Sequence, residues 1–89
     1  MRHPYSLDVA ILLLLVALPT NPYDLEQPLA AFGYVWSTSG TVSIRLKRLA
    51  EEGLVLRTWE TPGNERPRLI YSITEAGMAY LRRAALPRY

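Results

Sequence analysis

The residues between positions 39 and 48 have the types needed to bind a nucleic-acid backbone and to contact its bases. Small residues stand where a helix is expected to begin, and small side chains let the backbone N–H groups of a helix N-terminus approach a phosphate. Farther along the same segment, hydroxyl and ammonium groups can hydrogen bond to base edges, and an aliphatic side chain can contact a thymine methyl. The residues expected to contact DNA here are Ser39, Gly40, Thr41, Ser43, Ile44, Lys47 and Arg48.

A second cationic segment follows, in which Pro62 and Pro67 bracket a short tip. Arg66 lies in this tip and Arg68 directly after it. Arginine in such a tip suits phosphate contact or insertion into a minor groove. The charge of the chain is also uneven. Residues 1–44 hold one arginine against three carboxylates, whereas residues 45–89 hold nine cations against five glutamates. The positive half therefore coincides with both candidate segments.

Enzymatic chemistry finds little support among the remaining polar residues. His3 is the single histidine and there is no cysteine, so no metal-ligand cluster is expected. Asp24 and Glu26 are two positions apart, a spacing that points side chains in different directions on a helix. The serines have no neighbouring histidine base, and the glycines lack phosphate-loop spacing. We expect no enzymatic activity and no metal or cofactor.

A first helix is predicted from a Ser6 cap, with Asp8 in its first turn, to about Leu18. It is apolar on all sides, which predicts burial on all sides. A domain of 89 residues rarely surrounds a helix by itself, so we expect part of it to face a second copy of the chain. The residues assigned to this homodimer interface are Leu12, Leu13, Leu15 and Val16.

The same apolar run is too short to span a membrane, and residues 19–22 offer no convincing signal-peptide cleavage site. We therefore expect a buried helix and no membrane partner. The absence of cysteine fits a reducing cytoplasm.

Asn21 and Pro22 predict the start of a second helix, a cap followed by proline at the first helical position. Pro28 predicts a kink or a break near Gln27, and Gly33 the end of the helix. The residues expected to supply its apolar contacts are Tyr23, Leu25, Leu29 and Phe32.

A third helix is predicted to have Ser39 as its N-cap and to stop at Gly53. An advance of about 100° per residue places its apolar residues on one side and the candidate DNA contacts on the other. The predicted core stripe is Val42, Leu46, Leu49 and Ala50.

Alternating residues predict a β-hairpin made of Leu54 to Thr61 and Arg68 to Ile73. Thr74 then caps a last helix from Glu75 to about Leu86, which Pro87 ends. The residues predicted on its apolar face are Met78, Leu81 and Ala85.

These elements predict an α+β fold: a winged helix-turn-helix of three helices, a two-stranded wing and a short C-terminal helix, forming one domain over residues 1–89. Helix 39–52 would enter the major groove, and the 62–68 wing would lie on the backbone or in the minor groove. Trp36 and Trp59 are expected to pack as partial core where helices and hairpin meet.

The chain resembles the PadR-like transcriptional regulators, a branch of winged-helix repressors. The segments that carry the resemblance are Ile11-Leu-Leu-Leu-Leu15, Tyr23-Asp-Leu25, Trp36-Ser-Thr-Ser-Gly-Thr-Val42, Leu46-Lys-Arg-Leu-Ala-Glu-Glu-Gly-Leu-Val55 and Arg66-Pro-Arg-Leu-Ile-Tyr-Ser-Ile-Thr-Glu-Ala-Gly77. The resemblance implies a homodimeric repressor that binds double-stranded DNA. It also implies dimerisation through the first helix and a longer C-terminal helix. The chain differs from the usual family pattern at Pro22, Pro28, Ser43 and Ile44, so the family's base preference does not carry over.

Two other functions remain open at this point. A winged helix without DNA contacts would serve as a protein-interaction module, with Ile44 in an exposed apolar patch. A ligand-responsive regulator would use the two tryptophans to bind a small-molecule effector.

Overall fold

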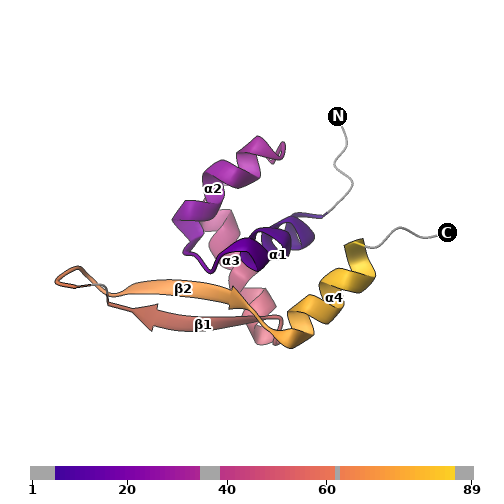
Figure 1. Ribbon diagram of the computed structural model, residues 1–89. Coiled ribbons are helices and arrows are strands. Elements are labelled where there is room, and N and C mark those ends of the chain that lie inside the picture. The colour runs from indigo at the N-terminus through magenta and orange to yellow at the C-terminus, as the bar shows by residue number, and fades with distance from the viewer. Residues whose placement is uncertain (1–5, 35–38, 62, 86–89) are drawn as a thin grey trace.

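The computed structural model describes residues 6–34, 39–61 and 63–85. Three helices come first: α1 (Leu7–Ala17), α2 (Pro22–Ala31) and α3 (Ser39–Glu51). An antiparallel hairpin of β1 (Val55–Glu60) and β2 (Arg68–Ile73) follows, and then α4 (Glu75–Ala85). The hairpin projects to one side of the helices, and α3 lies behind α1 in the view of Figure 1. This is the predicted α+β arrangement of a winged helix-turn-helix.

The first helix begins where its sequence predicts. The Ser6 hydroxyl accepts a hydrogen bond from the Val9 N–H at 3.3 Å, which caps one of the unpaired donors of the first turn. The prediction of burial on all sides was wrong, because α1 contacts α2, α4 and β2 but is open on its remaining side. Leu13 and Val16 are 37% and 48% exposed there.

This placement corrects half of the predicted dimer interface. Leu12 and Leu15 are enclosed in the core of their own chain, so they have no surface to offer a second copy. Leu13 and Val16 remain available, because they lie on the uncovered side of α1. The apolar run in the sequence could not separate the two sides, since every position in it is hydrophobic.

The second helix starts as predicted, and the Asn21 Oδ1 accepts from the Asp24 N–H at 3.0 Å. Of the predicted kink or break near Gln27, the break is wrong, because α2 is continuous through Pro28, whose missing N–H costs one hydrogen bond of the helix. The kink stays a prediction. Gly33 ends it with φ of 102°, a conformation that glycine adopts without steric cost. Of the four predicted apolar contacts, Leu25 and Leu29 are buried, whereas Tyr23 and Phe32 are exposed.

The third helix presents the predicted stripe to the core, with three members fully buried and Ala50 partly so. It begins at Ser39 itself, so the residue predicted as its cap is its first helical residue. Gly53, with φ of 78°, closes the other end. The Leu54 N–H then reaches the Leu49 carbonyl at 2.9 Å, and the Gly53 N–H reaches that of Ala50 at 3.0 Å.

The hairpin has the register that pairs Val55 with Ile73 and Glu60 with Arg68. β2 has the predicted bounds, and β1 is one residue shorter than predicted at each end. A third chain segment adds to the sheet, because Thr20 and Tyr71 exchange two backbone hydrogen bonds of 3.1 and 2.9 Å. This bridge, which the sequence did not predict, ties the α1–α2 linker to the base of the wing.

Thr74 caps α4 as predicted, accepting from the Gly77 N–H at 3.0 Å, and its hydroxyl also donates to the Gly53 carbonyl at 2.7 Å. A Cβ at Gly77 would collide with the Leu54 carbonyl. The start of α4 is therefore packed against the turn that ends α3, and only glycine allows this approach. On the predicted apolar face, Leu81 is buried and Met78 is partly buried; the side chain of Ala85 and the predicted stop at Pro87 lie outside the described part.

All the helices and both strands contribute to one hydrophobic core. Within the described ranges, no helix is both long enough and apolar enough to cross a membrane.

Candidate nucleic-acid interface

The solvent face of α3 carries most of the residues expected to contact DNA. Gly40, Ser43, Lys47 and Arg48 are exposed, and Ile44 is 69% exposed. Thr41 is partly buried, and the helix starts at Ser39. This face lies opposite the buried stripe because residues advance by about 100° along a helix. The structure thus gathers a hydroxyl, an aliphatic side chain and two cations on one exposed surface.

An ion pair also links α3 to α1. The Arg45 Nη1 lies 3.7 Å from the Asp8 Oδ1, an oxygen that is buried and has no hydrogen-bond partner in the described part of the chain. This distance is too long for a hydrogen bond but short enough for charge attraction. Arg45 therefore points to the flank of α3, beside the candidate DNA-contacting face and not on it.

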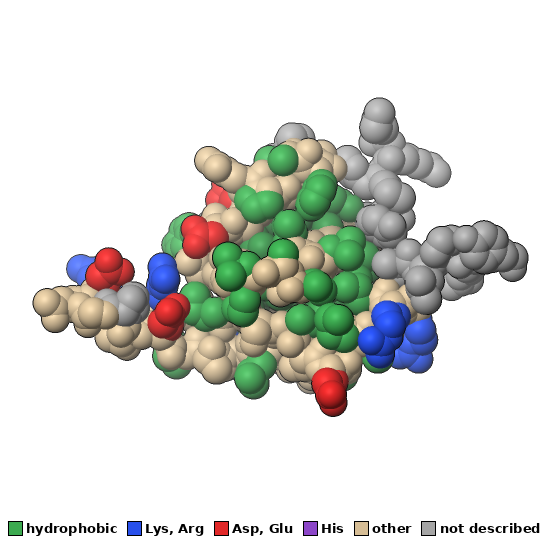
Figure 2. Space-filling model, viewed as in Figure 1, with side chains coloured by type: hydrophobic (Ala, Val, Ile, Leu, Met, Phe, Trp, Pro, Cys, Tyr) green, Lys and Arg blue, Asp and Glu red, His purple; other side chains and the backbone are tan. Residues whose placement is uncertain are grey.

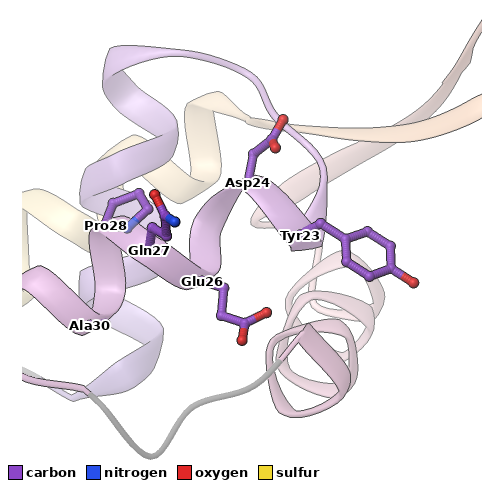
Figure 3. Close-up of a pocket in the computed structure, with 6 residues that line it drawn as sticks. All are labelled: Tyr23, Asp24, Glu26, Gln27, Pro28 and Ala30. Carbon is purple, nitrogen blue, oxygen red and sulfur yellow. The ribbon is translucent and has the colours of Figure 1, made fainter.

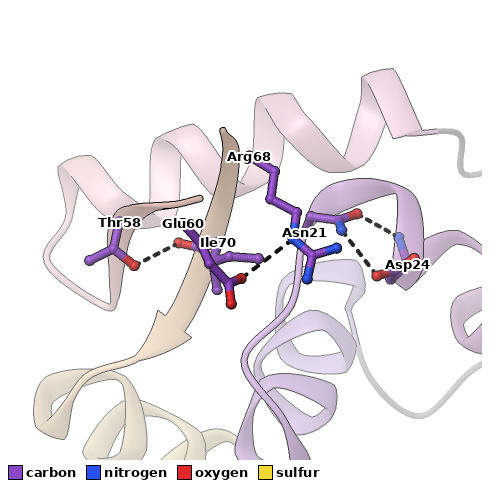
Figure 4. A network of polar contacts seen from close by, with 6 residues as sticks. All are labelled: Asn21, Asp24, Thr58, Glu60, Arg68 and Ile70. Atoms are coloured by element: carbon purple, nitrogen blue, oxygen red, sulfur yellow. Dashed lines mark hydrogen bonds and ion pairs between the residues drawn. The ribbon is translucent and has the colours of Figure 1, made fainter. Parts of the chain in front are cut away.

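The wing brings its two arginines to the surface at the far end of the hairpin. Arg66 and Arg68 are exposed, and the Arg68 Nε donates to the Glu60 Oε2 at 3.4 Å (Figure 4). Both partners of this pair are about half exposed, so it contributes little to stability. Its effect is local, because it aligns the Arg68 side chain across the ends of β1 and β2.

Arg57 is a cation near α3 that the sequence reasoning missed. It lines a shallow hollow of about 220 Å³ together with Lys47, Ala50 and Glu51. The available signal was strand alternation, since Arg57 lies on the same face of β1 as Val55, and β1 contacts α3. The first strand of the wing therefore places a second cation at the hollow that Lys47 lines, which also holds the carboxylate of Glu51.

Trp59 corrects a prediction, because it is 71% exposed and does not pack as core. Trp36 lies outside the described residues. Trp59 lies near the end of β1, away from the core residue Val55. It lines a groove of about 480 Å³ between the hairpin and the start of α2. Tyr23, Asp24 and Arg68 line the same groove.

Another hollow, of about 570 Å³, is lined by residues of α2 alone (Figure 3). The side chains of Asp24 and Glu26 extend from α2 in different directions there, as predicted, so this surface does not pair two carboxylates. Among the described residues, no group of three or more histidine, aspartate or glutamate side chains is placed to hold a metal ion.

Three helices followed by a hairpin, with an exposed cationic face on α3, define a winged helix-turn-helix protein. The profile of the transcriptional regulator PadR-like family matches residues 11–83. The chain belongs to this family.

Solved structures of PadR regulators share the fold. A PadR-like transcriptional regulator from Bacillus cereus is 24% identical, with a TM-score of 0.80 over 89% of this chain and 77% of that one. A PadR family regulator from Eggerthella lenta is 29% identical, with a TM-score of 0.70 over 86% of this chain and 69% of that one. No curated protein matches the chain.

PadR from Bacillus subtilis, solved in complex with operator DNA, is 25% identical with a TM-score of 0.79. The match covers 93% of this chain and 48% of that protein, so the chain spans about half the length of the Bacillus subtilis regulator.

Proposed function

We propose that the chain is a sequence-specific DNA-binding regulator, acting as a repressor, that places α3 in the major groove and residues 62–68 on the backbone or in the minor groove. The observation that carries this proposal is the exposed face of α3, with Ser43, Ile44, Lys47 and Arg48 opposite the stripe that packs in the core. The operator complex of Bacillus subtilis PadR supports the choice of DNA as partner.

The residues would divide the work between positioning and recognition. The first turn of α3, from Ser39 to Thr41, would offer its backbone N–H groups to a phosphate. Ser43, Ile44 and Lys47 would contact base edges. Arg48 on α3 and Arg66 and Arg68 on the wing would neutralise phosphates, because contacts to the backbone set register while base contacts set specificity.

We also propose that the regulator is a homodimer and that the exposed side of α1 is part of the interface. Figure 2 shows hydrophobic side chains gathered over the centre of the face formed by α1 and α4, with charged side chains toward its margins. The exposed large hydrophobic residues of these helices are Leu13, Val16 and Tyr80. Since α3 lies behind α1, a dimer through this face would leave the candidate DNA-contacting face of α3 open.

Selection from a library of randomised duplexes by the purified chain tests the function. We expect enrichment of one sequence and binding of that sequence at least about a thousandfold tighter than random DNA at the same salt concentration. Equal binding of selected and random duplexes would remove the claim of sequence specificity, and no binding to either would favour a protein-interaction module. A regulator of this kind would work in the cytoplasm beside DNA, without catalytic activity.

A further inference from the structure

The aliphatic side chain of Ile44 lies in the middle of the exposed face of α3. It is 69% exposed and stands about 200° around the helix from Val42, which is fully buried. Single exposed apolar residues are common on protein surfaces, so exposure alone explains nothing. What distinguishes Ile44 is the set of residues around it.

The neighbours of Ile44 on this face are polar or have no side chain. Gly40 lies one turn before it, Lys47 and Arg48 lie one turn after it, and Ser43 is adjacent; all four are exposed. Gly40 has no side chain to cover the N-terminal side of Ile44. The cations and the hydroxyl surround it with groups that bind phosphates and base edges. Ile44 is thus a single apolar side chain within a polar surface. Such a surface does not suit a flat hydrophobic partner.

The major groove of DNA offers one apolar group at a base edge, the 5-methyl group of a pyrimidine. We infer that Ile44 recognises this methyl group, carried by thymine or by 5-methylcytosine, at one position of the DNA site. The inference rests on the proposed DNA-binding function and adds the chemical group that α3 selects. Burial of one methyl group against Ile44 should change affinity about three- to fivefold.

The test uses the full chain and the duplex obtained by selection from random sequences. Each thymine is replaced in turn by uracil, which removes only the methyl group, and binding is measured by fluorescence anisotropy. At the position that responds, cytosine and 5-methylcytosine are then compared. Ile44→Ala is measured on the same duplexes, with Leu56→Ala as the matched control, since Leu56 is an exposed aliphatic residue on the hairpin outside the proposed interface.

We expect one thymine whose replacement by uracil weakens wild-type binding about three- to fivefold, and the same ratio close to one in Ile44→Ala. Leu56→Ala should keep the wild-type ratio. A gain from 5-methylcytosine over cytosine would show that methylated cytosine is also recognised, and a gain confined to thymine would assign thymine as the source. Specific binding that ignores uracil at every position overturns the inference and leaves the function intact. A uracil effect that persists in Ile44→Ala overturns it too, while failure to select any duplex removes the proposed function itself.

Discussion

Arg45 on α3 and Asp8 in the first turn of α1 form an ion pair, with 3.7 Å between Nη1 and Oδ1. Asp8 also lies where a carboxylate is favourable, at the N-terminus of its own helix. The pair connects the first helix to α3, the helix proposed to read DNA.

A double-mutant cycle with Asp8→Ala and Arg45→Ala should give a coupling free energy below about 1 kcal/mol, measured by urea unfolding. The expected value is small because Arg45 is 40% exposed and solvent screens the pair. A coupling of several kcal/mol would mean that the pair is shielded from solvent more than the structure shows.

Lys47→Ala should weaken binding to the selected duplex by about 1–3 kcal/mol and should weaken binding to random DNA less, because a base contact is lost. Arg83→Ala is the control with the same charge change, since Arg83 is exposed on α4. If the two variants lost the same affinity on both duplexes, Lys47 would contribute only its positive charge and no base contact.

Arg66→Ala should weaken binding to all sequences similarly and should flatten the slope of log K against log salt by about one unit. The reason is the position of Arg66 in the wing, where a phosphate contact releases one counterion. Titrations of specific and random duplexes at several salt concentrations measure the slope. An unchanged slope would remove Arg66 from the backbone contacts.

Gly77→Ala should destabilise the fold by about 1–3 kcal/mol, because the added Cβ collides with the Leu54 carbonyl, which is backbone and cannot turn aside. Gly40→Ala is the contrast, since Gly40 is an exposed helical glycine and alanine should stabilise it by up to about 1 kcal/mol. Thermal unfolding of the wild-type chain and of both variants measures the two changes in stability. Similar effects would mean that α4 shifts to make room.

Val16→Glu should convert the proposed dimer to a monomer at micromolar concentration, because a carboxylate would be buried in the interface without a partner. Leu56→Glu places the same charge on an exposed leucine of the hairpin and should leave the dimer intact. Sedimentation equilibrium measures both. A wild-type chain that sediments at its monomer mass would refute the dimer directly.

The sequence alone determined the features that depend on neighbouring residues. Ser6 and Asn21 cap α1 and α2, Gly33 and Gly53 end α2 and α3, and β2 has the predicted bounds. The helix ends are local effects, since a cap or a left-handed glycine acts within one turn, and the bounds of β2 followed from the alternation of its residues. The separation of the α3 stripe from its exposed face followed from helical periodicity in the same way.

Which surfaces are covered depended on how the elements pack together. It buried Leu12 and Leu15 but left Val16 exposed, although all three belong to one apolar run. It placed Arg57 beside Lys47 and left Trp59 outside the core. It also joined Thr20 to Tyr71 and brought Gly77 against Leu54, contacts between segments more than twenty residues apart. Burial and long-range pairing depend on how whole elements pack, and no local pattern carries that information.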